Sequence, residues 1–435
     1  MLAAIAGSGR QHLLPAHSAV LERLLTRDGE PMEAMEIFTA LGTPAGRANP
    51  YPHYAALHAL GEAVTVAPGA VAVVGYDAIN SVLRDAGFGV SDDASFDASF
   101  PGWQRNPVFV QAADWILNLN GARHARIRSL IGRTFTARRI AGLEPAIARM
   151  ADDLLDAMAD RGTDGGTVEF MHDFAYLLPV TVICELIGIP ESDRESFRPV
   201  ARDLAGVFEI YDTESMPAIN AAAVELLAYF TGLATQRRAD PRDDLISDLL
   251  AVSDSGDGRL TDAELLHNLT LLLVAGFETT TNLLGNGLQI VLQDPAVGEA
   301  VRDRSVPVAA FVEEVLRYDS PVQLTSRTGC DAKVGGVAIA PGDEVLTLLG
   351  AGNRDPRRFA EPDTFNPLRS DGGPLSFGGG AHFCVGAALA RLEGSVAFPR
   401  LFSRFPAIAS AGEPRSRKVS LRTGSPADAL PVTVA

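Results

Sequence analysis

Beyond about residue 140, apolar residues recur every three or four positions, the spacing of helices that bury one face. The longest such stretches are 216–238 and 262–292, and Thr261 is placed to cap the second of them. Shorter helices are predicted over residues 54–60, 141–159 and 174–186, and from about residue 241. The pattern therefore predicts a largely helical protein.

Strand-like patterns are few and short. Residues 64–74 form two apolar segments around a Pro-Gly turn, which is typical of a hairpin. The Gly- and Pro-containing turns of residues 334–343 indicate further short strands, and the polar stretch 91–106 predicts a long loop. With no internal repeat or linker in sight, we predict one large domain over residues 46–435. Its fold class is mainly α with a small β part, and residues 1–45 form a poorly defined N-terminal extension.

Composition narrows the class of protein. The formal net charge of −17 argues against a nucleic-acid binder, which would need a basic face. The most apolar run, residues 269–275, is far shorter than the ~20 residues of a membrane span. Cys184, Cys330 and Cys384 are widely spaced, which fits neither a disulfide framework nor a zinc site. These features favour a cytoplasmic, soluble protein that binds neither nucleic acid nor membrane.

The segment with the strongest chemical signal is Ser376-Phe-Gly-Gly-Gly-Ala-His-Phe-Cys-Val-Gly386, which runs into a helix former. Its glycines permit a tight loop and a close approach of the backbone to a flat ligand. Free N–H groups at the helix start favour the anionic form of the Cys384 sulfur, and a thiolate can be an axial haem ligand. The alternatives are a small buried hydrophobe, a phosphate-binding loop and half of a metal site with His382. No complete phosphate-binding pattern and no second pair of metal ligands follow in the sequence.

The pattern Phe377-Gly378-x-Gly380-x-His382-x-Cys384-x-Gly386 resembles the haem-binding loop of cytochromes P450 of the soluble bacterial type. The resemblance extends from about residue 46 to the C-terminus. It implies the P450 fold, haem b (iron protoporphyrin IX) as cofactor, and Cys384 as the ligand of the haem iron. It also assigns cofactor contacts to Phe377, Gly378, His382 and Gly386.

Glu314 and Arg317 lie one turn apart on a predicted helix and could form no more than an exposed pair worth a few tenths of a kcal/mol. In this chain Pro321, Arg327, Asn353-Arg-Asp-Pro356 and Arg369 follow in the order found in P450s. The resemblance therefore implies a buried structural network of Glu314 and Arg317 with a later arginine, which supports the Cys loop.

Two further residues are spaced to bind an anion. His124 and Arg128, at i and i+4 on a predicted helix, can reach one anionic group together. By the resemblance they bind a haem propionate, as do Arg327 and His382. The family's usual Asp-Pro-Pro before this histidine is replaced by residues 120–122, Asn-Gly-Ala, which is expected to loosen the start of the helix.

The long helix contains Ala275-Gly-Phe-Glu-Thr279. An ordinary buried helix would show Thr279 bonded back to a carbonyl one turn earlier. The P450 resemblance implies more: Ala275 and Gly276 are small enough to pass close to the haem, and Glu278 and Thr279 form the catalytic proton-delivery pair.

Residues 121–142 contain six arginines and no acidic residue, in a chain of net negative charge. This segment is either a solvated helix face or a docking patch for an acidic electron carrier. The arginines are Arg123, Arg126, Arg128, Arg133, Arg138 and Arg139.

The resemblance implies a monomeric haem-thiolate monooxygenase that inserts one oxygen atom from O₂ into a small hydrophobic organic substrate by hydroxylation or epoxidation. Ferredoxin and ferredoxin reductase would supply electrons, and bacterial secondary metabolism is the expected setting. Segments 91–117, 197–227 and 322–325 match walls of the substrate pocket, where Phe208, Ile210, Val322 and Leu324 suggest an apolar substrate. Peroxide-driven oxidation, oxidative coupling or rearrangement, and a non-catalytic haem-binding role are the alternatives.

Overall fold

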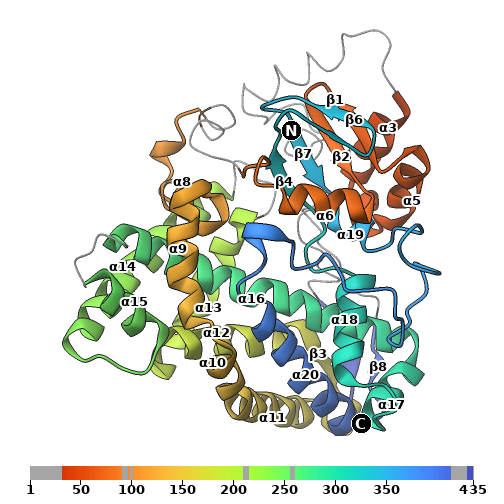
Figure 1. Cartoon of the computed structure of the whole chain (residues 1–435). Coiled ribbons are helices and arrows are strands. Elements are labelled where there is room, and N and C mark those ends of the chain that lie inside the picture. Colours follow the sequence, from red (N-terminus) through yellow and green to blue (C-terminus); the bar gives the residue numbers. More distant parts are fainter. Residues whose placement is uncertain are drawn as a thin grey trace.

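The computed structural model describes residues 32–90, 97, 101–208, 215–254, 260–412 and 429–434. Helices make up most of the chain, and the strands of the main sheet lie with the N-terminal helices at one end of it (Figure 1). The predicted fold class, mainly α with a small β part, is confirmed.

The main sheet joins segments from both halves of the chain. Strands β1 (Ala63–Ala67) and β2 (Ala70–Val73) form the predicted antiparallel hairpin. Strand β2 then pairs in parallel with β7 (Glu344–Thr347), which pairs antiparallel with β4 (Thr325–Thr328). The sheet order is β1-β2-β7-β4, so the N-terminal hairpin is fixed to the segment that precedes the Cys loop.

The folded part of the chain begins before residue 46. Helix α3 (Met32–Leu41) buries Ala34, Phe38 and Leu41 in one apolar cluster with α5 (Tyr51–Leu60) and strands β1, β2 and β7. Helix α4 (Pro44–Ala48) follows it directly. Residues 32–45 therefore belong to the domain and not to an extension; the earlier part of the predicted extension lies outside the described residues.

The remaining strands and the helices have the following bounds. The minor strands are β3 (Thr167–Glu169), β5 (Ala332–Val334), β6 (Val337–Ile339), β8 (Ala409–Ser410) and β9 (Pro431–Thr433). The longer helices are α6 (Tyr76–Arg84), α9 (Gly121–Thr134), α11 (Glu144–Arg161), α12 (Leu177–Ile187), α13 (Glu191–Ala205), α14 (Met216–Ala239), α15 (Leu245–Ser253), α16 (Asp262–Gln293), α17 (Pro295–Arg302), α18 (Val308–Tyr318) and α20 (Ala387–Arg404). Shorter ones are η1 (Trp103–Arg105), α8 (Pro107–Ala112), η2 (Ile116–Asn118), α10 (Ala137–Gly142), η3 (Thr163–Gly165), η4 (Met171–Ala175), η5 (Gly206–Phe208), α19 (Leu349–Gly352) and η6 (Gly380–His382).

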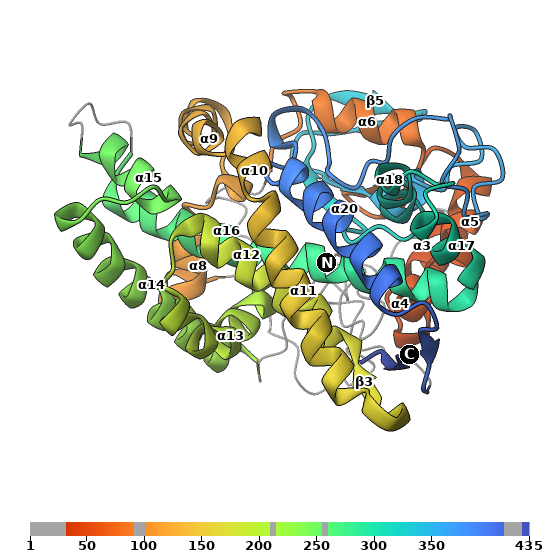
Figure 2. The same cartoon turned by 90° about the horizontal axis from the view of Figure 1, so that it is seen from below.

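The central helix α16 is the element around which the others pack. Its N-terminus is a capping box, in which the Thr261 hydroxyl accepts from the Glu264 N–H and the Glu264 carboxylate accepts from the Thr261 N–H. Helices α12, α14 and α20 all contact it, and α11 and α20 lie side by side (Figure 2). The cap and the unbroken apolar spacing explain why this helix was predictable to within one residue at its C-terminus.

Two other helix predictions needed correction. The helix expected from about residue 241 begins at Leu245, because the Asp244 side chain accepts from the Ser247 N–H and caps it there. The stretch 174–186 is divided between the wide π turn η4 and helix α12.

Helix α14 bears on the prediction that no membrane is involved. Within the described ranges it is one helix that could cross a membrane, judged by length and composition alone. It packs against α8, α13, α15 and α16 and buries residues such as Leu226 and Phe230. Packed core helices meet the same criterion, so this is weak evidence for a span.

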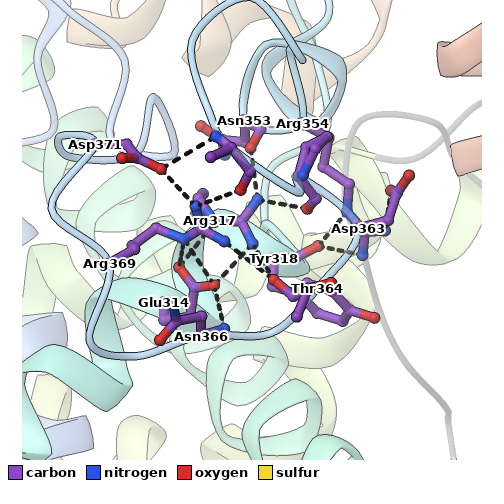
Figure 3. A network of polar contacts seen from close by, with 12 residues as sticks. Glu314, Arg317, Tyr318, Asn353, Arg354, Asp363, Thr364, Asn366, Arg369 and Asp371 are labelled. Carbon is purple, nitrogen blue, oxygen red and sulfur yellow. Dashed lines mark hydrogen bonds and ion pairs between the residues drawn. The ribbon is translucent and has the colours of Figure 1, made fainter.

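A buried ion-pair network joins α18 to the segment 353–371, which precedes the Cys loop (Figure 3). On α18, Arg317 donates to both carboxylate oxygens of Glu314 at 2.8 Å. The Arg369 Nε lies 3.0 and 2.9 Å from the same two oxygens. Arg317 also donates to the main-chain oxygens of Asn353 and Thr364. The ion pair expected between Glu314, Arg317 and a later arginine is thus present, and the later arginine is Arg369.

The network continues into the start of the Cys loop through Asn353. Its side-chain nitrogen donates to the Ser376 hydroxyl at 2.9 Å, and its oxygen accepts from the Leu375 N–H at 2.7 Å. The Ser376 hydroxyl in turn donates to the Leu316 carbonyl of α18 at 2.6 Å. These bonds fix where the loop begins relative to α18.

We predict that Glu314→Gln strongly destabilises the protein. The change leaves two buried guanidinium groups facing a neutral amide, and removing one partner of a buried ion pair costs about 3–5 kcal/mol. Urea denaturation of the purified variant, followed by circular dichroism, measures the loss.

Glu313→Gln is the matched control. Glu313 is the preceding residue, and its ion pair with Arg391 is more than one third exposed on both sides. An exposed pair contributes about 0–1 kcal/mol, so this variant should denature close to wild type. Equal denaturation midpoints for the two variants would show that the buried network does not hold the fold.

Candidate haem site

The Cys loop has a backbone that only glycine adopts readily. Gly378 and Gly380 have φ angles of 68° and 62°, in the left-handed region. At Gly380 a Cβ atom would also lie 2.2 Å from the Leu83 carbonyl oxygen of α6. The loop closes on itself where the Cys384 N–H donates to the Phe377 carbonyl at 2.9 Å. These constraints place Cys384 directly before α20.

The Cys384 side chain is accessible although it lies deep in the molecule, so it faces an interior space. Burial raises the pKa of this thiol. The N–H groups of Gly386 and Ala387, which bond to the sulfur, and the charges of Arg128 and Arg391 oppose that rise. The donors expected at the helix start are therefore directed at the sulfur, and a metal cation would complete the stabilisation of the thiolate.

Four basic side chains from three parts of the chain converge near this loop: His124, Arg128, Arg327 and His382. The two histidine rings lie 4.1 Å apart between centroids. Burial lowers the pKa of Arg327 to about 10. Burial, together with the positive charges of His124, Arg327 and Arg128, lowers the pKa of His382 to about 3.

No acidic residue in the described part of the chain forms an ion pair with any of these four side chains, and the buried His124 Nε2 has no hydrogen-bond partner there. Arg128 and Arg327 are therefore positive charges without a carboxylate partner in that part of the chain, and the two histidines, whose lowered pKa values keep them neutral, can donate further hydrogen bonds. This set fits a ligand that brings its own negative charge. Haem has two propionates and an iron that a thiolate can bind. The residues present therefore fit haem: Cys384 would hold the iron and the four basic groups would hold the propionates.

The start of α9, where the family's Asp-Pro-Pro is absent, is well anchored. The Asn120 side chain accepts from the Val90 N–H and donates to the Val90 carbonyl, both at 2.9 Å. Gly121, at φ 56°, begins the helix. The expected loosening is absent, because the asparagine fixes the helix that carries His124 and Arg128.

The middle of α16 is more accessible than the turns before it. Ala275, Gly276, Glu278 and Thr279 are partly exposed, whereas residues 271–274 are buried. Thr279 donates back to the Ala275 carbonyl at 3.2 Å, as an ordinary buried helix would show. Its oxygen can still accept a hydrogen bond, so the back-bond is compatible with a role in proton delivery.

Gly276 also has a packing role that the sequence did not indicate. A Cβ atom at this position would lie 2.7 Å from the Ile183 side chain of α12. The glycine therefore allows α12 and α16 to pack closely, independently of any cofactor.

Three of the six arginines in the arginine-rich segment are neutralised by acids from other parts of the chain. Arg123 and Arg126 both bind Glu264 at the start of α16, and Arg123 also binds Asp114. Burial opposes ionisation of Glu264, but the bonds from the arginines and the Thr261 N–H lower its pKa to about 2. A further pair of carboxylates, Asp243 and Asp248, binds Arg139.

The segment therefore offers fewer free charges than its sequence indicates. Arg128 is directed toward the Cys384 side. Arg133 and Arg138 are exposed, and a docking surface would rest on these two residues.

Of the residues expected to line a substrate pocket, two pack in or against apolar clusters. Leu324 is 1% exposed in the cluster beneath the main sheet, so it is a core residue. Val322 packs against another cluster. Phe208 is partly buried beside Trp115, and Ile210 and most of 91–100 lie outside the described residues.

Comparison with known proteins agrees with this geometry. The family model described as "Cytochrome P450" matches residues 61–305 and 307–423. The chain is 38% identical over 373 residues to cytochrome P450 monooxygenase PikC of Streptomyces venezuelae, covering 83% of this chain and 85% of the relative. It is 36% identical over 342 residues to 6-deoxyerythronolide B hydroxylase of Saccharopolyspora erythraea, covering 77% and 83%. The solved structure of CYP164A2 from Mycobacterium smegmatis matches with a TM-score of 0.80 and 35% identity, covering 92% of this chain and all of that one.

We predict that Arg128→Leu speeds the loss of haem from the purified protein about ten- to a hundredfold. The change removes one hydrogen bond to a charged group, worth about 1.5–3 kcal/mol. Transfer of haem to excess apomyoglobin, followed by absorbance, measures the rate.

Arg133→Leu on the same helix provides the control, because Arg133 is exposed and should leave the rate unchanged. If the two variants lose haem at the same rate, Arg128 does not hold a propionate.

Proposed function

Because the chain belongs to the cytochrome P450 family, we propose that it is a haem-thiolate monooxygenase that inserts one atom of O₂ into a small hydrophobic organic molecule. The observation that carries the proposal is the accessible Cys384 sulfur, with helix-start N–H groups directed at it. Four basic side chains lie nearby and have no carboxylate partner among the described residues. The similarity to proteins named as a monooxygenase and a hydroxylase supports the same reaction.

When bound, haem b supplies the redox chemistry for R–H + O₂ + 2e⁻ + 2H⁺ → R–OH + H₂O. The chain holds the reacting centre in place: Cys384 is the anionic ligand of the iron, and the basic cluster neutralises the propionates. The network around Glu314 keeps the loop that presents Cys384 in a single position.

Glu278 and Thr279 are proposed to supply the protons. Both are partly exposed in the middle of α16, where the surrounding turns are buried. The Thr279 oxygen can accept a proton-relay hydrogen bond while its hydrogen bonds to Ala275. Glu278 carries the carboxylic acid that would connect this site to solvent protons. This pair favours use of O₂ over direct use of peroxide.

The substrate class is proposed from the relatives and the apolar surroundings. The name of one relative specifies 6-deoxyerythronolide B, and another relative is a polyketide biosynthesis cytochrome P450 of Bacillus subtilis. We propose a natural-product scaffold, such as a polyketide, terpenoid or peptide, that is hydroxylated or epoxidised in bacterial secondary metabolism.

Electrons are proposed to come from a ferredoxin and its reductase in the cytoplasm, with the monooxygenase acting as a monomer. The exposed Arg133 and Arg138 are the part of the arginine-rich segment that would attract an acidic ferredoxin.

We predict that Thr279→Ala uncouples O₂ consumption from product formation. A positioned proton donor contributes about 10²- to 10⁴-fold to its step, so product per electron should fall about tenfold or more and hydrogen peroxide should rise. Oxygen-electrode, peroxide and product measurements on the reconstituted system check this.

Thr281→Ala is the matched control. Its hydroxyl also donates one turn back, to Phe277 at 2.9 Å, but it lies two residues further along the helix. It should remain coupled, and a Thr279→Ala variant with unchanged yield per electron would refute the proton-delivery role.

We predict that the double change Arg133→Glu and Arg138→Glu slows reduction by ferredoxin about tenfold or more at low salt, because steering by charge sets the encounter rate. Stopped-flow absorbance measures reduction, and substrate affinity should not change. Arg302→Glu serves as control, since α17 lies far from α9 in both Figures 1 and 2. A double variant reduced as fast as this control would place the docking surface elsewhere.

A further inference from the structure

The chain has two tryptophans. The indole N–H of one has a hydrogen-bond acceptor, and that of the other has none within the described residues. Trp103 donates to the Asp97 carboxylate at 2.9 Å. Trp115 is 2% exposed, and its Nε1–H has no acceptor within the described residues. An unsatisfied buried donor costs about 1–3 kcal/mol, and native structures rarely keep one without a reason.

The main chain on both sides of Trp115 is fixed to α16. The Ile116 N–H donates to the Asn268 side-chain oxygen at 2.9 Å, and the Asn268 side-chain nitrogen donates to the Asp114 carbonyl at 2.9 Å. The Asp114 carboxylate also bonds to His267 at 2.7 Å. The main chain that carries the indole is therefore held against the central helix.

This anchor lies on the face of α16 that carries the proposed reaction site. Asn268, Ala275 and Thr279 are separated by seven and four residues, so they line one face of the helix. At 1.5 Å per residue, Thr279 is about 16 Å along the axis from Asn268 and Ala275 about 10 Å. The Phe208 ring, partly buried at the end of η5, lies 6.0 Å from Trp115. Trp115 and Phe208 thus form an aromatic pair with one N–H, and the main chain of Trp115 is anchored about two and three turns of α16 before Ala275 and Thr279.

We propose that Trp115 is a specificity-determining residue whose Nε1–H donates to an oxygen atom of the substrate. The proposal rests on the monooxygenase function and narrows its substrate class. The substrate has an apolar framework with a carbonyl, ether or hydroxyl oxygen away from the bond that reacts. The N–H is closed to solvent, so water does not compete for it. The proposal therefore requires a neighbour of the indole, such as the partly buried Phe208 ring, to move when the acceptor binds.

The test uses two probes of equal ring size, cyclododecanone and cyclododecane, which differ in one acceptor oxygen. Binding is measured by the spectral shift of the haem-loaded protein. A net hydrogen bond of about 0.5–1.5 kcal/mol corresponds to a two- to tenfold change in affinity. Trp115→Phe should therefore weaken cyclododecanone binding two- to tenfold and leave cyclododecane binding unchanged. Trp103→Phe, which removes the other indole N–H, should leave both affinities unchanged.

A second readout follows the N–H itself. In ¹⁵N-labelled protein, in the diamagnetic reduced carbon monoxide form, the two indole signals are assigned with the Trp103→Phe and Trp115→Phe variants. Cyclododecanone should shift the Trp115 N–H signal downfield and leave the Trp103 signal in place, because the latter already has its acceptor.

The proposal is overturned if the ketone binds no better than the hydrocarbon, including the case in which neither binds, or if Trp115→Phe leaves ketone affinity unchanged. A stationary Trp115 signal with ketone bound would overturn it equally. Failure of the monooxygenase function is a separate result, because it would appear as O₂ consumption without oxygenated product in the reconstituted wild type, whichever ring binds.

Discussion

The buried carboxylate of Glu314 is the interaction on which the site depends. It binds Arg317 and Arg369 together, and the same guanidinium groups hold main-chain oxygens on the segment that leads to the Cys loop. A loop rich in glycine loses much conformational entropy on folding and cannot hold one geometry by itself. The network fixes where the loop begins, contact with α6 fixes its middle, and α20 fixes its end. Cys384 is thereby presented in one position.

The distribution of charge explains why the site binds an anion although the protein is strongly negative. Acids from distant segments neutralise Arg123, Arg126 and Arg139. These three arginines of α9 and α10 therefore add little positive charge to the surface of the protein. Around the Cys loop the opposite holds, because His124, Arg128, Arg327 and His382 come together without carboxylate partners in the described ranges. The surplus charge of Arg128 and Arg327 fits the propionates of haem, the cofactor bound by the P450 family to which the chain belongs.

Features encoded in local spacing could be predicted from the sequence, and features made by distant partners could not. Helix α16, its Thr261 cap, the β1–β2 hairpin and the pair His124 and Arg128 all follow from residues within a few positions of one another. The pairing of Arg126 with Glu264 joins residues 138 positions apart. The sequence therefore did not show that part of the positive charge of this segment is neutralised. The anchoring of α9 by Asn120, the packing role of Gly276 and the unsatisfied N–H of Trp115 likewise depend on tertiary contacts that no local pattern contains. Helix α3 was missed because its burial depends on the distant sheet.

The central claim is the bond between the Cys384 sulfur and haem iron, and one spectrum tests it most directly. The purified, haem-loaded protein is reduced under carbon monoxide, and its absorption is compared with that of the reduced protein alone. A thiolate ligand predicts the long-wavelength Soret band that gives cytochromes P450 their name. A Soret band only at the shorter wavelength typical of histidine-ligated haem, in freshly purified protein, would contradict the account.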